Sequence, residues 1–199
     1  MENLKVRRLT MASILGAMAF ILMYFNFGIP FLSPFAEFDG SALPELIGGF
    51  ILGPVGAVEI ISIKLILILI LKGTSSMFTG EIQNFLLSVS YVLPAVLYYR
   101  NHKTKKGAII GIVLGSIISV ITAIFTNIYI IFPFYIRLYG MSWDSIVSMC
   151  SAVNPWIKDI PTMIAFSIVP FNVISRTATS IITVMVYKKV SIPLKKFLQ

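Results

Sequence analysis

The chain has 199 residues, of which 57% are hydrophobic and only 12% charged, with a formal net charge of +8 and a mean hydropathy of +0.92. This composition excludes an ordinary water-soluble domain and predicts a membrane protein, whose backbone must satisfy its own hydrogen bonds and therefore forms helices. We expect a single domain over residues 1–199, an all-α integral membrane protein built as a compact bundle of six transmembrane helices.

The positive charge is grouped at the ends of the apolar runs rather than spread over them. Three clusters hold 11 of the 16 basic residues. This placement argues against a nucleic-acid partner and is typical of the positive-inside rule, which predicts a multi-pass protein of the plasma membrane with cytoplasmic N- and C-termini. Six crossings put every cluster on the same side; the members are Lys5, Arg7 and Arg8, then Arg100, Lys103, Lys105 and Lys106, and finally Lys188, Lys189, Lys195 and Lys196.

The first predicted helix runs from Leu9 to Phe25 and is followed by a glycine- and proline-containing loop, residues 28–40, with an acidic stretch at its end. On the helix, small residues recur with a spacing of four. Such spacing lets a second helix approach closely, so it predicts either a docking face for a partner or ordinary packing inside the bundle. The residues concerned are Ala12 and Gly16, and Ser13 and Ala17.

The second helix is predicted to begin near Ala42, and Gly53-Pro54 predicts a kink or break in it. A third, short helix is expected over residues 60–71. Glu59 and Lys64 flank this junction, and because charge is costly at mid-membrane we expect both at the inner interface.

The fourth helix is predicted over Gly80–Tyr99, and the fifth over Gly107–Phe132. The fifth contains the charge-free stretch of 26 residues at 109–134, which exceeds the roughly 20 residues needed to cross a bilayer. A polar stretch at 137–159 predicts an external loop or short helix. The sixth helix is expected over Pro161–Tyr187, interrupted at Pro170.

Several polar side chains interrupt the last three predicted helices. Asn84, Asn127 and Asn172 lie one in each, and Arg176 lies near the expected midplane. Amides donate and accept hydrogen bonds, so with the neighbouring aromatic residues they predict a pocket for a flat organic ligand. Bonding between helices is the alternative for the amides, and an arginine at this depth needs a partner or a water-filled cavity.

Catalysis finds little support in the sequence. His102 is the only histidine and lies in a basic loop, which excludes a histidine-based metal cluster, and no glycine-rich phosphate loop is present. We therefore expect no enzyme activity, no metal and no cofactor. A membrane-embedded enzyme that uses Glu59 or Glu81 remains the alternative from another class, although Glu81 also suits the start of a helix.

The order of these features resembles the S components of energy-coupling factor (ECF) transporters, and within them the riboflavin type. The resemblance covers nearly the whole chain, and the order and spacing of its short motifs are its specific part. The motifs are the small-residue first helix followed by residues 29–32, the segments 39–44 and 46–56, the stretch Gly80-Glu81-Ile82-Gln83-Asn84-Phe85-Leu86, and the pair formed by residues 127–135 and 168–174.

This resemblance implies a six-helix bundle that binds a vitamin from outside. Riboflavin would then be the transported ligand, and a transmembrane T component and two cytoplasmic ATPases would be the partners. The small residues of the first helix would form the docking face for the T component. The implied ligand contacts are Asn84, Asn127, Asn172 and Ser175, with Asp39 on the loop and Arg176 as a further cationic candidate.

Three positions depart from the riboflavin-type pattern. That pattern has a lysine where this chain has Ser175, an acidic residue where it has Ala42, and a Lys-Asn pair where it has Lys64-Leu65. Arg176 could supply the missing cation, although one residue along a helix is turned by about 100°. An S component for another vitamin or precursor, and a purely structural subunit with no ligand, therefore stay open.

Overall fold

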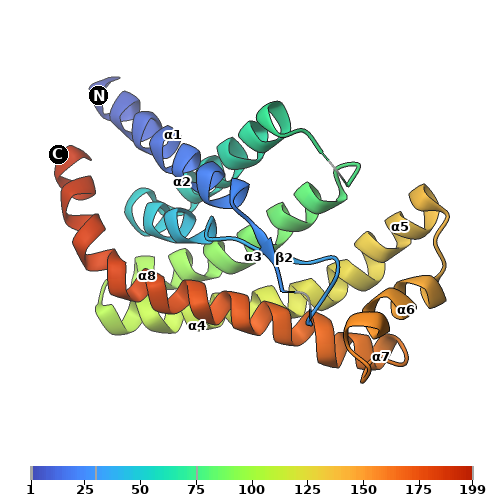
Figure 1. Ribbon diagram of the computed structural model, residues 1–199. Coiled ribbons are helices and arrows are strands. Elements are labelled where there is room, and N and C mark those ends of the chain that lie inside the picture. The colour runs from blue at the N-terminus through green and yellow to red at the C-terminus, as the bar shows by residue number, and fades with distance from the viewer. Residues whose placement is uncertain (1, 30, 75, 199) are drawn as a thin grey trace.

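The structure is a computed structural model that describes residues 2–29, 31–74 and 76–198 (Figure 1). Pro30 and Ser75, and the side chains of Lys188 and Lys195, lie outside the described part. The elements are α1 (Glu2–Tyr24), β1 (Phe27–Gly28), β2 (Glu37–Phe38), α2 (Ala42–Leu71), α3 (Thr79–Asn101), α4 (Lys105–Thr126), η1 (Asn127–Ile131), α5 (Phe132–Tyr139), α6 (Trp143–Val153), α7 (Ile160–Met163), η2 (Ile164–Ile168) and α8 (Val169–Leu198).

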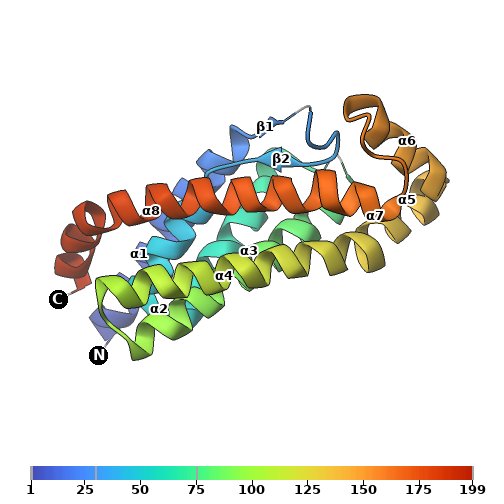
Figure 2. The same ribbon diagram turned by 90° about the horizontal axis from the view of Figure 1, so that it is seen from below.

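The long helices pack side by side, and the short elements gather at one end of the bundle. Helix α1 packs on α2, α2 on α3 and α3 on α4, and α8 contacts both α2 and α4. Figure 2 shows α4 and α8 running alongside each other for much of their length. Five helices of the described residues are long and apolar enough to cross a membrane, which supports a multi-pass membrane protein.

Helix α2 reverses its direction at Gly53. This glycine has φ 86° and ψ −173°, a backbone conformation that is essentially restricted to glycine, and Pro54 follows it. Lys64 contacts Glu45, 19 residues earlier, whereas the two would lie about 28 Å apart in a straight helix. The predicted break is therefore confirmed, but the second arm begins directly after Gly53 rather than at Ile60.

Two wide, π-helical turns interrupt the spans on either side of the external elements. In each, the first residue accepts a hydrogen bond from the N–H five residues later, and each turn ends two residues before a proline, Pro133 or Pro170. Proline donates no hydrogen bond, so it leaves a carbonyl of the preceding turn free. Asn154 Nδ2 donates to the carbonyl oxygen of Phe166, which Pro170 leaves free, at 3.4 Å.

Helices α3 and α4 approach closely at Gly115, where a Cβ atom would collide with the backbone carbonyl oxygen of Tyr91. A group of three aromatic side chains, one each from α2, α3 and α8, packs together within the bundle. The rings of Phe50 and Tyr99 lie 4.7 Å apart, those of Phe50 and Tyr187 lie 5.5 Å apart, and the two tyrosine hydroxyl groups are hydrogen-bonded at 3.0 Å. We call these three residues the aromatic plug.

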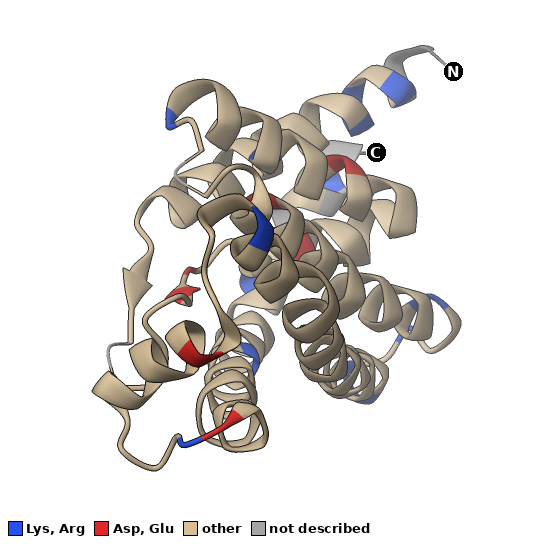
Figure 3. Ribbon diagram, turned by 90° about the vertical axis from the view of Figure 1, so that its right-hand side faces the viewer, with Lys and Arg blue, Asp and Glu red and all other residues tan. Residues whose placement is uncertain are grey.

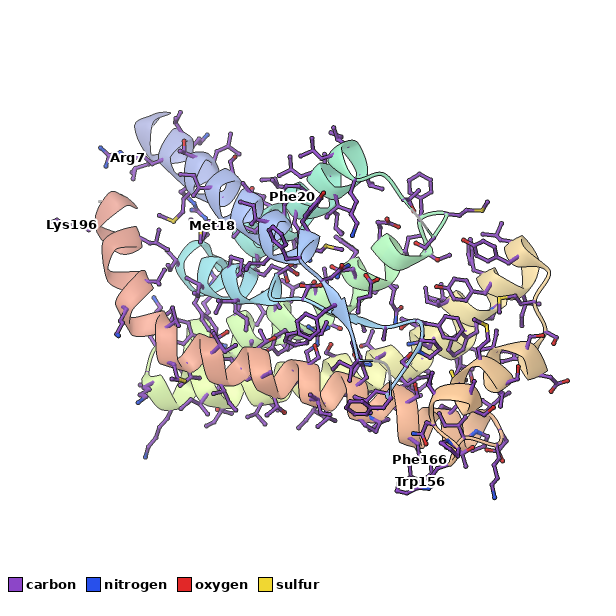
Figure 4. The ribbon with its side chains drawn as sticks, in the orientation of Figure 1. Arg7, Met18, Phe20, Trp156, Phe166 and Lys196 are labelled. Atoms are coloured by element: carbon purple, nitrogen blue, oxygen red, sulfur yellow. The ribbon has the colours of Figure 1, made fainter. Side chains whose placement is uncertain are left out.

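The basic clusters lie together at the end of the molecule where the chain starts and finishes. Arg8 donates to the carbonyl oxygen of Leu52 at 2.8 Å, and Arg8, Arg100 and Lys103 surround a hollow of about 340 Å³ beside Gly53. Figure 4 shows Arg7 and Lys196 at this end and Trp156 and Phe166 at the opposite one. Charged positions are sparse along the long helices between them (Figure 3).

Candidate ligand-binding site

A cavity of about 370 Å³ is lined by the loop between α1 and α2 and by residues of α2, α3, η1, α5 and α8, and none of the clustered basic residues lines it. Its size is in the range usual for small-molecule sites. Every residue predicted as a ligand contact lines it, namely Asn84, Asn127, Asn172, Ser175 and Asp39, and so does Arg176. The structure thus brings together side chains that are up to 137 positions apart in the sequence.

The buried ammonium group of Lys64 connects α2 with α3 beside the cavity. Lys64 forms an ion pair with Glu45, and its Nζ donates to Ser41 Oγ at 3.1 Å and to Asn84 Oδ1 at 2.6 Å. Both charged side chains are fully buried. The interface position expected for Lys64 is therefore wrong, because the reversal at Gly53 brings a buried carboxylate to it.

Residues Glu45 and Ser88 of this network were missed from the sequence. Ser88 Oγ lies 3.3 Å from both Lys64 Nζ and Glu45 Oε1, and it is buried. A signal for Glu45 is present in the sequence. Glu45 and Lys64 stand nearly the same number of residues from the Gly53-Pro54 break, so a helical hairpin turning there pairs them.

The amides in the cavity differ in the group that they leave for a ligand. Asn84 accepts from Lys64 through Oδ1, so its NH₂ group remains to donate. Asn127 and Asn172 donate instead from Nδ2 to carbonyl oxygens one turn earlier, at 2.7 Å and 2.9 Å. Their oxygens remain as acceptors, so the site offers both kinds of hydrogen-bonding group, as the edge of a polar heterocycle requires.

The loop between α1 and α2 forms the outer wall of the cavity. Its two short strands pair antiparallel, with Phe27 opposite Phe38 and their ring centroids 5.3 Å apart. Asp39 Oδ1 accepts from the backbone N–H of Ser41 at 2.7 Å, which places the carboxylate at the start of α2 and in the cavity wall. The acidic stretch predicted at this loop therefore borders the site.

The two glutamates of the enzyme alternative lie in different places. Glu59 is exposed and lines neither described hollow. Glu81 is in the first turn of α3 and lines the cavity, where it accepts from the hydroxyl groups of Thr74 at 3.1 Å and Ser76 at 3.3 Å. Within the described part of the chain, no group of three His, Cys, Asp or Glu side chains could hold a metal ion.

The small residues of α1 divide between two faces. Ala12 and Gly16 are buried, and a Cβ atom on Gly16 would collide with the side chain of Ile63 in α2. They pack within the bundle, which was one of the two alternatives. Ser13 is exposed and Ala17 half-buried, so this pair is the one that remains open to a partner.

Comparison with known proteins gives one family. The model of the substrate-specific component of ECF transporters matches residues 7–187. The riboflavin transporter RibU of Staphylococcus aureus (strain TCH60) is 30% identical over 96% of this chain and 93% of its own. The riboflavin transporter FmnP of Bacillus subtilis (strain 168) is 27% identical over 98% and 96% of the two chains.

A solved structure agrees with these matches. It is that of the S component of a bacterial ECF transporter, which superposes with a TM-score of 0.74 at 28% identity and covers 96% of this chain and 99% of its own. The similarity extends along the chain from α1 to α8 and includes every element that lines the cavity. The chain therefore belongs to the family of ECF transporter substrate-specific components, which are transporter subunits and not enzymes.

Proposed function

We propose that this chain is the riboflavin-binding S subunit of an ECF importer. The single observation that supports this most is the convergence of Asn84, Asn127 and Asn172 on one cavity, with opposite hydrogen-bonding groups facing it. The oxidised isoalloxazine ring of riboflavin has carbonyl oxygens on either side of an N–H group, so one edge needs both donors and acceptors. The names of the relatives point to the same ligand.

In this proposal Ser175 and Asp39 complete the ligand contacts, and the β1–β2 loop covers the ligand after it enters from outside. A transmembrane T component and two cytoplasmic ATPases would be the partners, and their ATP hydrolysis would drive release inside. The exposed pair Ser13 and Ala17 on α1 would face the T component. The chain itself performs no chemistry on the ligand.

The proposed topology has both termini in the cytoplasm of a cell whose plasma membrane the bundle crosses. The gathering of the basic clusters at one end supports it, because positive residues favour the cytoplasmic side. The arms of α2 on either side of Gly53 would serve as the second and third crossings, which gives six in all. The first arm, residues 42–52, is about 16 Å long and covers only part of the bilayer thickness, so the segment before Ala42 would have to complete this crossing.

The test is the visible absorption spectrum of the protein purified in detergent without added ligand. We expect flavin bands at close to one equivalent, and riboflavin fluorescence that is quenched on rebinding. Asn127→Ala and Asn172→Ala should then weaken binding at least tenfold, whereas Asn101→Ala, an exposed residue beyond the cavity, should not.

A colourless protein that also ignores added riboflavin would contradict the riboflavin proposal and leave the family unchanged. In that case the specific observation to follow is Ser175, which stands where the riboflavin-type pattern has a lysine. A screen of other vitamins and their precursors for thermal stabilisation would then identify the ligand class. Failure of every ligand would favour the purely structural alternative.

A further inference from the structure

Arg176 lies on α8 in the wall of the cavity, one turn beyond Asn172. Its guanidinium carbon is 4.8 Å from the centre of the Tyr91 ring, and the Tyr91 hydroxyl group is held by Ser180 Oγ at 2.8 Å. The arginine is thus placed against a ring that is itself fixed. An arginine on an aromatic face is attracted by the ring, but its N–H groups stay available at the edge of the guanidinium plane.

No carboxylate forms an ion pair with Arg176 in the described part of the chain, although Glu45 and Asp39 act on its charge from a distance. Among the described residues the ion pair is that of Lys64 with Glu45, and no hydrogen bond from the Arg176 side chain is formed. Its Nε is buried and without a partner. Burial of Nε without a partner lowers the stability of the empty protein, because the lost hydration of that atom is not replaced.

From this imbalance we infer that Arg176 is the specificity-determining cation of the site, and that a bound ligand supplies its missing acceptors. The inference rests on the proposed function. The planar guanidinium suits two acceptor atoms side by side on one edge of a ring. In riboflavin, N1 and the C2 carbonyl oxygen of the oxidised ring form such a pair. Arg176 would thereby take over the role of the cation that the chain lacks at Ser175.

This role has a signature that a structural arginine would not give. Removing the unmatched charge leaves the empty protein as stable as before or more stable, while it weakens ligand binding. Removing a structural arginine has the opposite effect, with lower stability and little change in affinity. The sign of the stability change therefore separates the two roles.

The experiment compares Arg176→Met and Arg176→Lys with the native chain in detergent. The measurements are the unfolding midpoint without ligand and the riboflavin affinity from fluorescence quenching. We expect Arg176→Met to keep or raise the midpoint and to weaken binding at least tenfold, with Arg176→Lys in between. Arg137→Met is the matched control, since Arg137 is exposed and outside the cavity wall.

A second readout uses the ligand itself at saturating concentration. Reduction of a flavin places negative charge near N1, and a nearby cation makes it easier. The reduction potential of bound riboflavin should therefore be lower in Arg176→Met than in the native chain. A lower midpoint without ligand, a loss of affinity below tenfold, or an unchanged potential would each overturn the inference.

Failure of the proposed function is recognised separately. If the native chain does not bind riboflavin, that proposal fails, and the midpoints without ligand still decide the state of Arg176. A higher unfolding midpoint for Arg176→Met than for the native chain then supports a cation without a protein partner, which would bind a different ligand rich in acceptor atoms. A lower midpoint for Arg176→Met shows that the arginine is structural and overturns the inference.

Discussion

At the scale of single residues, a buried pair of charged side chains lies beside the cavity, although isolated charges are costly within a bilayer. Lys64 and Glu45 are both fully buried, and their pairing is what makes a lysine tolerable at this depth. The same ammonium group donates to Asn84 Oδ1, so the NH₂ end of that amide is the one left free for the contact that we propose with the ligand. A stabilising contact and a recognition contact thus depend on one side chain.

The Lys64–Glu45 pair gives a prediction about both stability and binding. Lys64→Met leaves a buried carboxylate without its partner and should destabilise the protein by about 3–5 kcal/mol. The double variant Lys64→Met with Glu45→Met should recover most of that loss, because two apolar side chains replace a buried ion pair. Riboflavin affinity should stay low in both, since Asn84 is no longer oriented.

Thermal unfolding in detergent and fluorescence quenching measure the two effects. A matched control is Lys158→Met, which removes one cation from an exposed external position. Equal destabilisation by the single and double variants would contradict the assigned pairing. Full affinity in the double variant would contradict the orienting role of Lys64.

Cys150 provides a chemical probe of the same cavity. It is buried in α6, it lines the cavity, and it is the only cysteine of the chain. Burial raises the pKa of its thiol to about 11, from a starting value of 9.0. Only the thiolate reacts, so alkylation by iodoacetamide at pH 8 should be about a hundredfold slower than in the unfolded chain.

The sign of the pH dependence follows from the raised pKa. The alkylation rate should rise about tenfold for each pH unit up to about 11, where the thiol becomes ionised. Riboflavin should slow the reaction further, because it occupies the cavity that Cys150 lines. Mass spectrometry of the intact protein follows the rate, and fast labelling at pH 8 would show that the Cys150 thiol is not buried.

At the scale of elements, the reversal of α2 depends on a single glycine. Gly53→Ala forces an L residue into a region of φ and ψ that is essentially restricted to glycine, at an expected cost of about 1–3 kcal/mol. Gly28→Ala is the control, because a Cβ there meets no atom within 4 Å and its φ is not positive. The unfolding midpoint in detergent should fall for the first and not for the second.

The strain at Gly53 is conformational rather than steric, since a Cβ atom there also has no neighbour within 4 Å. An unchanged midpoint for Gly53→Ala would mean that the turn can adopt another backbone conformation. A loss of riboflavin binding together with stability would show that the Lys64–Glu45 pairing depends on this turn.

The apolar runs, together with the glycine and proline residues between them, predicted most of the elements correctly. The bounds predicted at 80–99 and the short helix within 137–159 are confirmed by α3 and α6. The break at Gly53-Pro54 was visible too, because glycine and proline act locally. What the sequence could not show is the angle of that break, since the angle also depends on how the two arms pack, and Leu46 and Ile61 from the two arms belong to one buried cluster.

The candidate site shows the same division between local and distant causes. Asn84, Asn127 and Asn172 were identifiable because an amide within an apolar helix is conspicuous. Glu45 was not identified, since its role depends on the ion pair that it forms with Lys64 in the other arm of α2. The wide turn at Asn127–Ile131 was missed, whereas the interruption expected at Pro170 is present as the wide turn Ile164–Ile168, which ends two residues before that proline.

At the scale of the whole molecule, one face of α1 is left for a neighbour. Ser13 is exposed and Ala17 half-buried, and Ile14 and Met18 beside them are exposed. Small residues permit the close approach of another helix in a membrane, where packing drives association. This surface is separate from the contacts that we propose for the ligand.

The corresponding prediction separates binding from transport. Ser13→Phe and Ala17→Phe should leave riboflavin affinity unchanged and should reduce uptake by cells at least tenfold, because bulk prevents the approach of the T component. Ile117→Phe adds similar bulk to an exposed position of α4 and should leave uptake intact. Co-purification with the partner subunits checks the cause, and normal uptake by both α1 variants would contradict the assigned face.

The aromatic plug has a consequence for the cell as a whole. Phe50 and Tyr99 border the hollow at the basic end, and no described residue lines both this hollow and the ligand cavity, so the two hollows are separate. Hollows that do not join do not form a pore through the described part of the bundle. A subunit without a pore can accumulate in a membrane without dissipating the ion gradients across it.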